Sequence, residues 1–167
     1  MDDRIISARD VTKLYARSGG FESAEMGTLG IVTNAAVEFF YQPARKHTLQ
    51  SDFDVSRIQT LPRVGISHSY AGAEGIADPQ AKAVIVATTG LAPGEVKYYE
   101  TLRKNGIIVA TTFPSGREVA ETEDPTSGIP PVITVKHLMA SKARILMMLA
   151  LTKTQDPSAI QKLFDSY

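Results

Sequence analysis

The sequence predicts an α/β fold, in which a parallel sheet lies between layers of helices in a three-layer domain of the Rossmann-like or flavodoxin-like kind. Two continuous apolar runs, at 83–88 and 107–111, are typical of strands that are buried on both faces. Between them, residues 94–104 carry apolar side chains at helical spacing. A strand, a helix and a second strand in this order require a parallel sheet with helices on its faces.

Two shorter strands complete the expected sheet, and they cover 63–67 and 132–135. The connection between the first two strands, residues 69–82, contains Gly72, Gly75 and Pro79. A parallel crossover needs about a dozen residues or more, usually with a helix among them. This connection leaves little room for a helix, so we expect it to be short or irregular.

The ends of the helices are marked by residues that favour helix termini. Asn105-Gly106 follows the helix over 94–104, and glycine there accepts a left-handed backbone conformation. A strongly apolar helix is expected over 141–152. The last helix begins with Asp156 as its N-cap and Pro157 in its first turn, and its apolar residues recur at the spacing of one helical face.

The first part of the chain is expected to form a β-hairpin. Two β-prone runs, 29–32 and 37–41, are separated by a turn in which Asn34 is able to adopt a positive φ. Residues 9–21 are predicted to be loop, and the polar stretch 42–58 is predicted to be a linker. A lone hairpin cannot bury its apolar face in water, so this region needs something else to pack against.

Composition excludes several kinds of function. Lys plus Arg and Asp plus Glu both number 18, and a chain without net charge is a poor partner for nucleic acid. The sequence has no cysteine, which excludes disulfides, thiolate metal sites and cysteine nucleophiles, and its 3 histidines lack metal-ligand spacing. We therefore expect no metal and no cofactor.

No apolar run reaches membrane-spanning length and no signal peptide is visible, so the chain as written is expected to stay in the cytoplasm without a membrane partner.

Ligands of parallel sheets bind beyond the carboxyl ends of the strands, which here are the loops 67–75, 88–95 and 111–125. The loop that begins at Thr88 is either an ordinary turn or an anion-binding loop. The acidic stretch that contains Glu123 is either a solvated loop or the source of a carboxylate that binds a cationic group, such as an α-amino group. A lone lysine such as Lys13 is usually solvated.

Several motifs, taken in order along the chain, resemble one known family. They are Ala8-Arg9-Asp10-Val11-Thr12-Lys13, Glu25-Met26-Gly27-Thr28-Leu29-Gly30, Pro43-Ala44-Arg45-Lys46-His47-Thr48, Phe53-Asp54-Val55, Leu61-Pro62-Arg63-Val64, Lys142-Ala143-Arg144-Ile145-Leu146 and the tail from Leu149 to Pro157. Their order and spacing resemble the asparaginase/glutaminase family, in particular the bacterial type II L-asparaginases. The resemblance covers the whole chain but only the C-terminal half of a family member.

The resemblance implies a division of the chain into three parts. Residues 1–42 correspond to the end of the family's N-terminal domain, 43–60 to the linker between its domains, and 61–167 to its C-terminal domain. A natural truncation, a misplaced start and a cleaved product would all give such a chain. A full-length parent is expected in the periplasm if it is exported.

The resemblance also implies an activity, the hydrolysis of L-asparagine to L-aspartate and ammonia through a threonine nucleophile that lies in the other half. Among the family's catalytic residues, the lysine has its match in Lys13. Glu123 matches the carboxylate that contacts the substrate's α-amino group in the neighbouring subunit's site. The segment Leu91-Ala92-Pro93 departs from the family, because many members have an asparagine in this loop.

The expected substrate is therefore a small molecule, L-asparagine, with L-glutamine as the other option. The partner is expected to be a second copy of the chain in a homo-oligomer, or a separate N-terminal domain, and the chain alone is expected to be inactive. The alternative is a non-catalytic module for assembly or for binding a small amino acid.

Overall fold

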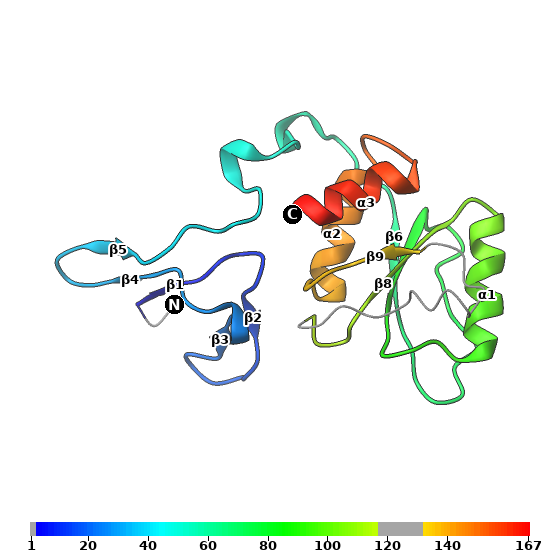
Figure 1. Ribbon diagram of the computed structural model, residues 1–167, viewed down its shortest axis with the longest axis horizontal. Helices are drawn as coiled ribbons and strands as arrows, with labels where there is room; N and C mark the ends of the chain where they lie inside the picture. Colours follow the sequence, from blue (N-terminus) through cyan, green and yellow to red (C-terminus); the bar gives the residue numbers. More distant parts are fainter. Residues whose placement is uncertain (1–2, 117–131) are drawn as a thin grey trace. The chain divides into compact units, whose positions relative to one another are not determined.

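A computed structural model describes residues 3–116 and 132–167, and the chain divides into two compact units, Met1–Ser51 and Asp52–Tyr167 (Figure 1). The boundary between the units falls inside the range 43–60 that the resemblance assigns to a linker. Each unit is described by itself below.

The second unit contains the predicted parallel sheet. Its strands are β6 (Val64–His68), β7 (Ala83–Ala87), β8 (Ile108–Thr112) and β9 (Ile133–Thr134), and they lie side by side in sequence order. All the neighbouring pairs are parallel. The four strands predicted from the apolar runs are thus confirmed, with boundaries that shift by a residue or two.

Helices cover both faces of this sheet, as the sequence predicted (Figure 1). Helix α1 (Pro93–Lys104) lies on one face, and α2 (Ala140–Ala150) and α3 (Pro157–Ser166) lie on the other. Successive side chains of a strand point to opposite faces. Accordingly, Ala83, Ile85 and Ala87 belong to the core shared with α2 and α3, whereas Val84 and Val86 pack with α1.

The connection from β6 to β7 contains no helix, which confirms the irregular crossover. None of residues 69–82, all of which the structure describes, is helical. Arg63, just before β6, donates to the side chains of Asp78 and Gln80 and holds the end of this connection against the start of the strand. The backbone N–H of Gln80 lowers the pKa of the Asp78 carboxyl group, and the Arg63 guanidinium adds to this effect.

A side chain of α3 completes the β9 side of the sheet. The Gln161 amide accepts a hydrogen bond from the Thr134 N–H at 2.9 Å and donates one to the Thr134 carbonyl at 3.1 Å. An unpaired strand edge exposes such backbone groups. Gln161 therefore occupies the place that a further strand would take.

The predicted helix ends are confirmed. Asn105 caps α1 and Gly106 follows with a φ of 81°, a conformation that glycine accepts without a steric penalty. The Asp156 carboxylate accepts hydrogen bonds from the N–H groups of Ser158 and Ala159 at the start of α3.

The first unit is built from short antiparallel strands. The predicted hairpin is confirmed as β4 (Gly30–Val32) paired with β5 (Val37–Phe39), and β1 (Arg4–Ile5) pairs with the other side of β4. Single-turn 3-10 helices lie at 24–26 and 48–50 in this unit, and a third, at 55–57, belongs to the second unit.

One expectation about the first unit is wrong, and the positive φ that Asn34 could adopt is not used. Residues 9–21, predicted as loop, contain β2 (Thr12–Lys13), which pairs with β3 (Phe21–Glu22). Asn34 does not adopt a positive φ. The turn is instead held by Thr33, whose N–H bonds the Ala36 carbonyl and whose hydroxyl oxygen accepts from the Ala36 N–H at 3.0 Å, so no left-handed residue is required.

We expect Asp156→Ala to lower the free energy of unfolding by about 1 kcal/mol, because the first N–H groups of α3 lose their acceptor. Urea denaturation measures this loss. The control is Asp156→Asn, which keeps an accepting oxygen and should stay within a few tenths of a kcal/mol of the parent. An equal loss in both variants would contradict the capping explanation.

Candidate functional site

Polar side chains gather where β6 and β7 end, at the edge of the sheet where ligands of such folds bind. Ser67 lies near the end of β6 and Ser69 follows it, Thr88 follows β7, and Glu95 and Tyr99 come from the first turns of α1. Of these side chains, those of Ser67, Thr88, Glu95 and Tyr99 are buried. The strand ends are therefore joined to the helix by an interior polar cluster.

Glu95 is the central residue of this cluster, and it is 0% exposed. Its Oε2 accepts a hydrogen bond from the Ser69 hydroxyl at 2.6 Å and another from the Ala92 N–H at 3.0 Å. Its Oε1 is buried without a hydrogen-bond partner. Because Ser69 follows β6 and Ala92 follows β7, this carboxylate ties the two loops together at the strand ends.

Tyr99 lies one turn further along the buried side of α1. Its hydroxyl donates to the Ser67 hydroxyl oxygen at 2.9 Å. Burial raises the pKa of Tyr99, the bond to Ser67 opposes this change, and the negative charge of Glu95 adds to it. The two buried polar residues of α1 thus hold the helix against β6 through serine hydroxyls.

The loop after β7 has the hydrogen bonds of an ordinary turn. The Thr88 hydroxyl accepts from the Gly90 N–H at 2.9 Å and donates to the Gly90 carbonyl at 2.7 Å. The Glu95 carboxylate lies at the start of α1, where an anion would otherwise bind. These contacts favour the turn over an anion-binding loop.

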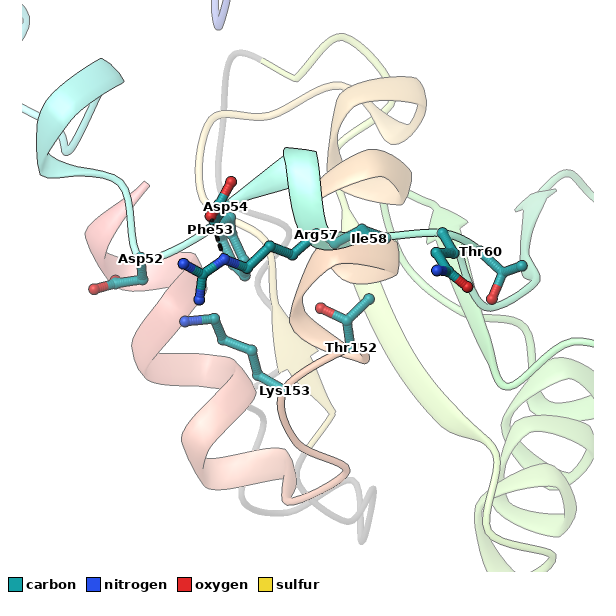
Figure 2. Close-up of a pocket in the computed structure, with 9 residues that line it drawn as sticks. Asp52, Phe53, Asp54, Arg57, Ile58, Thr60, Thr152 and Lys153 are labelled. Atoms are coloured by element: carbon teal, nitrogen blue, oxygen red, sulfur yellow. Dashed lines mark ion pairs between the residues drawn. The ribbon is translucent and has the colours of Figure 1, made fainter.

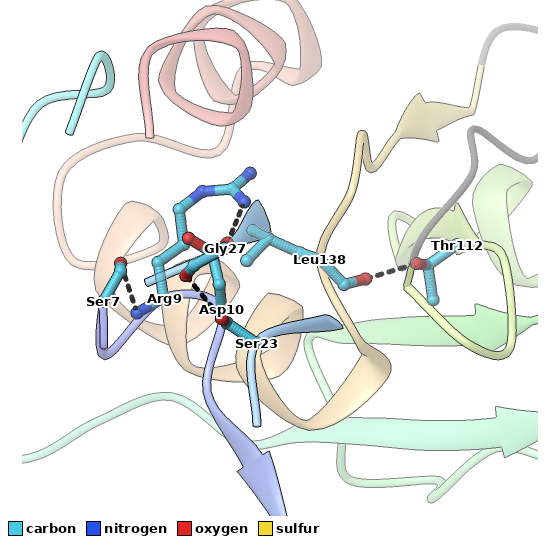
Figure 3. A network of polar contacts seen from close by, with 7 residues as sticks. All are labelled: Ser7, Arg9, Asp10, Ser23, Gly27, Thr112 and Leu138. Carbon is cyan, nitrogen blue, oxygen red and sulfur yellow. Dashed lines mark hydrogen bonds and ion pairs between the residues drawn. The ribbon is translucent and has the colours of Figure 1, made fainter. Parts of the chain in front are cut away.

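The end of β8 is fixed to the segment that precedes α2. The buried Thr112 hydroxyl donates to the Leu138 carbonyl, as Figure 3 shows. Glu123, the predicted substrate-binding carboxylate, comes after this strand and lies outside the described residues.

Lys13, the predicted catalytic lysine, ends β2 in the first unit. Lys13 pairs with Phe21 across the hairpin, and its Nζ lies 5.8 Å from the centre of the Phe21 ring. The residue is exposed to solvent. The ammonium group can therefore meet a ligand or a partner without any rearrangement of a core.

The turn before β2 sets the direction of the strand that carries Lys13. The Ser7 carbonyl accepts from the N–H groups of Asp10 and Val11, and its hydroxyl oxygen accepts from the Arg9 N–H at 3.2 Å. The Arg9 guanidinium pairs with the Asp10 carboxylate at 2.9 Å (Figure 3). The Arg9–Asp10 pair gives the Arg-Asp sequence of the motif a structural role in this turn.

A cavity of about 590 Å³ lies in the second unit between the linker and the end of α2 (Figure 2). It is lined by Asp52, Phe53, Asp54, Arg57, Ile58, Gln59, Thr60, Thr152 and Lys153. The Arg57 Nε pairs with Asp54 at 2.9 Å, and the Lys153 Nζ lies 5.4 Å from the centre of the Phe53 ring. Thr60 precedes β6, so this cavity flanks the amino end of the sheet and is separate from the strand-end cluster.

Within residues 3–116 and 132–167, no group of three or more histidine or acidic side chains is arranged to hold a metal ion. In the same residues, no helix has the length and apolarity needed to cross a membrane.

Sequence reasoning missed Glu95 as a member of the strand-end cluster. It named the loop 88–95 but gave Glu95 no role of its own. The available signal was position: Glu95 is the third residue of α1, where a carboxylate can accept the N–H of the residue before the helix. Burial of that carboxylate could not be inferred from spacing.

A parallel three-layer domain with polar groups at its strand ends defines an α/β protein of the kind that binds small ligands at this edge. No model of a known protein family matches the chain. Individual proteins of known name nevertheless match the chain. Escherichia coli L-asparaginase 2 is 34% identical over 183 residues, and the match takes in 100% of this chain and 51% of that protein.

Other relatives agree. Pseudomonas fluorescens glutaminase-asparaginase is 35% identical over 178 residues, with 100% of this chain and 49% of that protein matched. The crystal structure of a probable cytoplasmic L-asparaginase from Campylobacter jejuni superposes with a TM-score of 0.87 at 30% identity, and it covers 99% of this chain and 56% of that one. A relative from Haemophilus influenzae is named as a probable periplasmic L-asparaginase, so the names include both compartments.

The chain therefore belongs to the asparaginase/glutaminase family, and it corresponds to the C-terminal portion of these enzymes. It spans about half the length of the curated relatives it matches.

We expect Glu95→Ala to lower the free energy of unfolding by about 2 kcal/mol, because Ser69 and the Ala92 N–H both lose a buried acceptor. Glu95→Gln keeps the volume and one accepting oxygen, so its loss should be smaller. Urea denaturation compares both with Glu74→Ala, which removes an exposed carboxylate nearby. Equal effects of Glu95→Ala and Glu74→Ala would contradict this role of the buried carboxylate.

Ionisation of Tyr99 should lower the free energy of unfolding of the second unit at alkaline pH. Because its pKa is raised by folding, the stability it contributes is full below the unfolded value of about 10 and is lost as pH rises through the folded value. Tyr99→Phe should abolish this alkaline loss, whereas the neighbouring Tyr98→Phe should retain it. Urea denaturation from about pH 9 to about pH 11 tests this. Parallel profiles for the parent and Tyr99→Phe would contradict the assignment.

Proposed function

We propose that this chain is the C-terminal portion of an enzyme that hydrolyses the side-chain amide of L-asparagine, with L-glutamine as an additional substrate. The observation that carries the proposal is the match of the whole chain to about half of proteins named L-asparaginase and glutaminase-asparaginase. In this reaction, water replaces the amide nitrogen, and L-aspartate and ammonia are the products. No redox change occurs, so no redox cofactor is called for.

In the proposed mechanism, the hydroxyl of a threonine from the other half attacks the amide carbon, and ammonia leaves as the acyl-enzyme forms. Water then hydrolyses this ester, which releases L-aspartate and restores the threonine. Two threonines at the strand ends of the second unit, Thr88 and Thr112, do not suit this role. Thr88 and Thr112 are buried, and their hydroxyls are engaged with backbone carbonyls. This supports a nucleophile supplied by the half that the chain does not span.

Lys13 has the proposed role of assisting the nucleophile or the attacking water. Its ammonium group is a fixed positive charge that favours loss of a proton from a neighbouring hydroxyl. Its exposure at the end of β2 supports this role, because a second polypeptide segment can approach it. Glu123 has the proposed role of binding the substrate's α-amino group in a neighbouring subunit, where a carboxylate and an ammonium form a charge-assisted hydrogen bond.

The purified chain should release no ammonia from L-asparagine by itself. Mixed with the N-terminal half of Escherichia coli L-asparaginase 2, taken as the residues that precede the matched segment, it should release ammonia in a coupled assay. Lys13→Ala should lower this release by about 100-fold or more, in the range expected when a group that stabilises charge in the transition state is removed.

The matched control is Lys104→Ala, which removes another exposed lysine, at the end of α1. Release of ammonia by the chain alone would show that the chain contains a nucleophile. This result would overturn the proposal that the nucleophile comes from the other half. Saturable binding of L-asparagine by the chain alone, without release in either assay, would instead favour the amino-acid-binding module.

A further inference from the structure

The cavity between the linker and the end of α2 has no part in the strand-end cluster (Figure 2). Its volume of about 590 Å³ is in the range of pockets that hold small molecules. Two cationic side chains line it, Arg57 from the 3-10 helix at 55–57 and Lys153 from the segment after α2. All of its lining residues belong to the second unit, so its chemistry can be judged from that unit alone.

The charged ends of these two cations can still donate hydrogen bonds. The Arg57 Nε pairs with Asp54 at 2.9 Å, and its two terminal nitrogens have no partner among the residues that the structure describes. The Lys153 Nζ lies 5.4 Å from the centre of the Phe53 ring and, in the same part of the chain, has no carboxylate or carbonyl partner. Figure 2 shows that both side chains extend in the same direction, so their charged ends lie at one side of the cavity. Two like charges gathered in this way repel each other, and a bound anion would relieve that repulsion.

The acidic residues of the lining are engaged in bonds of their own. Asp54 accepts from the Ser56 N–H at 3.1 Å through Oδ1 and from Arg57 through Oδ2. The Asp52 carboxylate accepts from the Tyr167 hydroxyl at 3.4 Å. The carboxylates thus have donors already, whereas the ends of the cations lack acceptors. This difference favours an anionic ligand over a cationic one.

The cavity walls are held in place before any ligand binds. Phe53 packs against the core of the second unit and against the Tyr167 ring, with the ring centres 5.3 Å apart. The Lys153 N–H donates to the Ala150 carbonyl at 2.9 Å, which fixes the backbone of Lys153 at the end of α2. A site whose parts are already ordered loses less conformational entropy when a ligand binds.

We propose that this cavity binds a small dicarboxylate, with one carboxylate at the terminal nitrogens of Arg57 and the other at the Lys153 ammonium group. A guanidinium presents parallel donors that match a carboxylate, and an ammonium binds the second carboxylate as a point charge. The carbon chain between the carboxylates lies against Phe53 and Ile58, two apolar side chains that an inorganic oxyanion would leave to water. This site goes beyond the proposed function and does not depend on it.

The test is a titration of the isotope-labelled 167-residue chain with succinate, followed through the amide signals in NMR spectra. We expect saturable shifts that centre on residues 52–60 and 152–153. Binding should weaken by about threefold or more between about 0.02 M and about 0.15 M salt, because salt screens exposed charges. L-Aspartate, the product of the proposed reaction, is titrated in parallel, and the tighter ligand of the two identifies the source of the dicarboxylate.

The variant Arg57→Gln combined with Lys153→Gln removes both positive charges. We expect it to weaken succinate binding by about tenfold or more. Lys153→Arg keeps the charge and should bind within about threefold of the parent. The matched control is Lys97→Gln combined with Lys104→Gln, which removes the same charge from exposed residues of α1, on the other face of the sheet. This control should bind as the parent does, and the amide spectrum shows whether each variant is folded.

Several outcomes would overturn the proposal. Absence of saturable shifts with both dicarboxylates would show that the cavity takes no such ligand. Equal affinity for acetate would show that one carboxylate suffices, and equal affinity for inorganic phosphate would show that the site takes any oxyanion. Equal weakening in the double variant and in its α1 control would assign the effect to net charge alone. None of these measurements involves ammonia release, so failure of this proposal and failure of the proposed function are distinguishable.

Discussion

Strand β7 has both of its faces buried, and this condition organises the whole second unit. All five of its residues are buried. Alternate side chains of a strand must then be covered from two sides, which one layer of helices cannot do. Helix α1 covers Val84 and Val86, while α2 and α3 cover Ala83, Ile85 and Ala87. The backbone of β7 is paired with β6 and β8 in parallel register. The three-layer architecture follows from these requirements.

The same condition explains which features could be predicted from the sequence. A strand buried on both faces must be apolar without interruption, so β7 and β8 were visible as runs, and the helices as periodic patterns between caps. Strands β2 and β3 have two residues each, too few to show any period. Asparagine is a residue type that tolerates the left-handed conformation of such turns, yet the backbone N–H and the hydroxyl of Thr33 together close this turn without it. Side-chain hydrogen bonds of this kind leave no trace in a pattern of apolar residues.

The candidate site was predictable as a place more than as a set of residues. The rule that ligands bind beyond the strand ends directed attention to the right loops. It could not reveal that Glu95 turns inward, because burial of a carboxylate depends on donors such as Ser69 that are distant in sequence. Lys13 was found only through a motif of a known family, since nothing in its own neighbourhood distinguishes it from a solvated lysine. Under the proposed function, Lys13 acquires its catalytic surroundings from the other half of the enzyme.

The pairing of Gln161 with Thr134 has a consequence for the behaviour of the protein in crowded solution. A bare β9 edge would offer its amide and carbonyl to any extended chain, which is how sheets recruit one another into aggregates. Here both groups of Thr134 are occupied by an amide that mimics a backbone. Helix α3, whose apolar side also packs on the core, therefore prevents another polypeptide strand from pairing with this edge. One polar side chain on an otherwise apolar-facing helix thereby contributes to solubility.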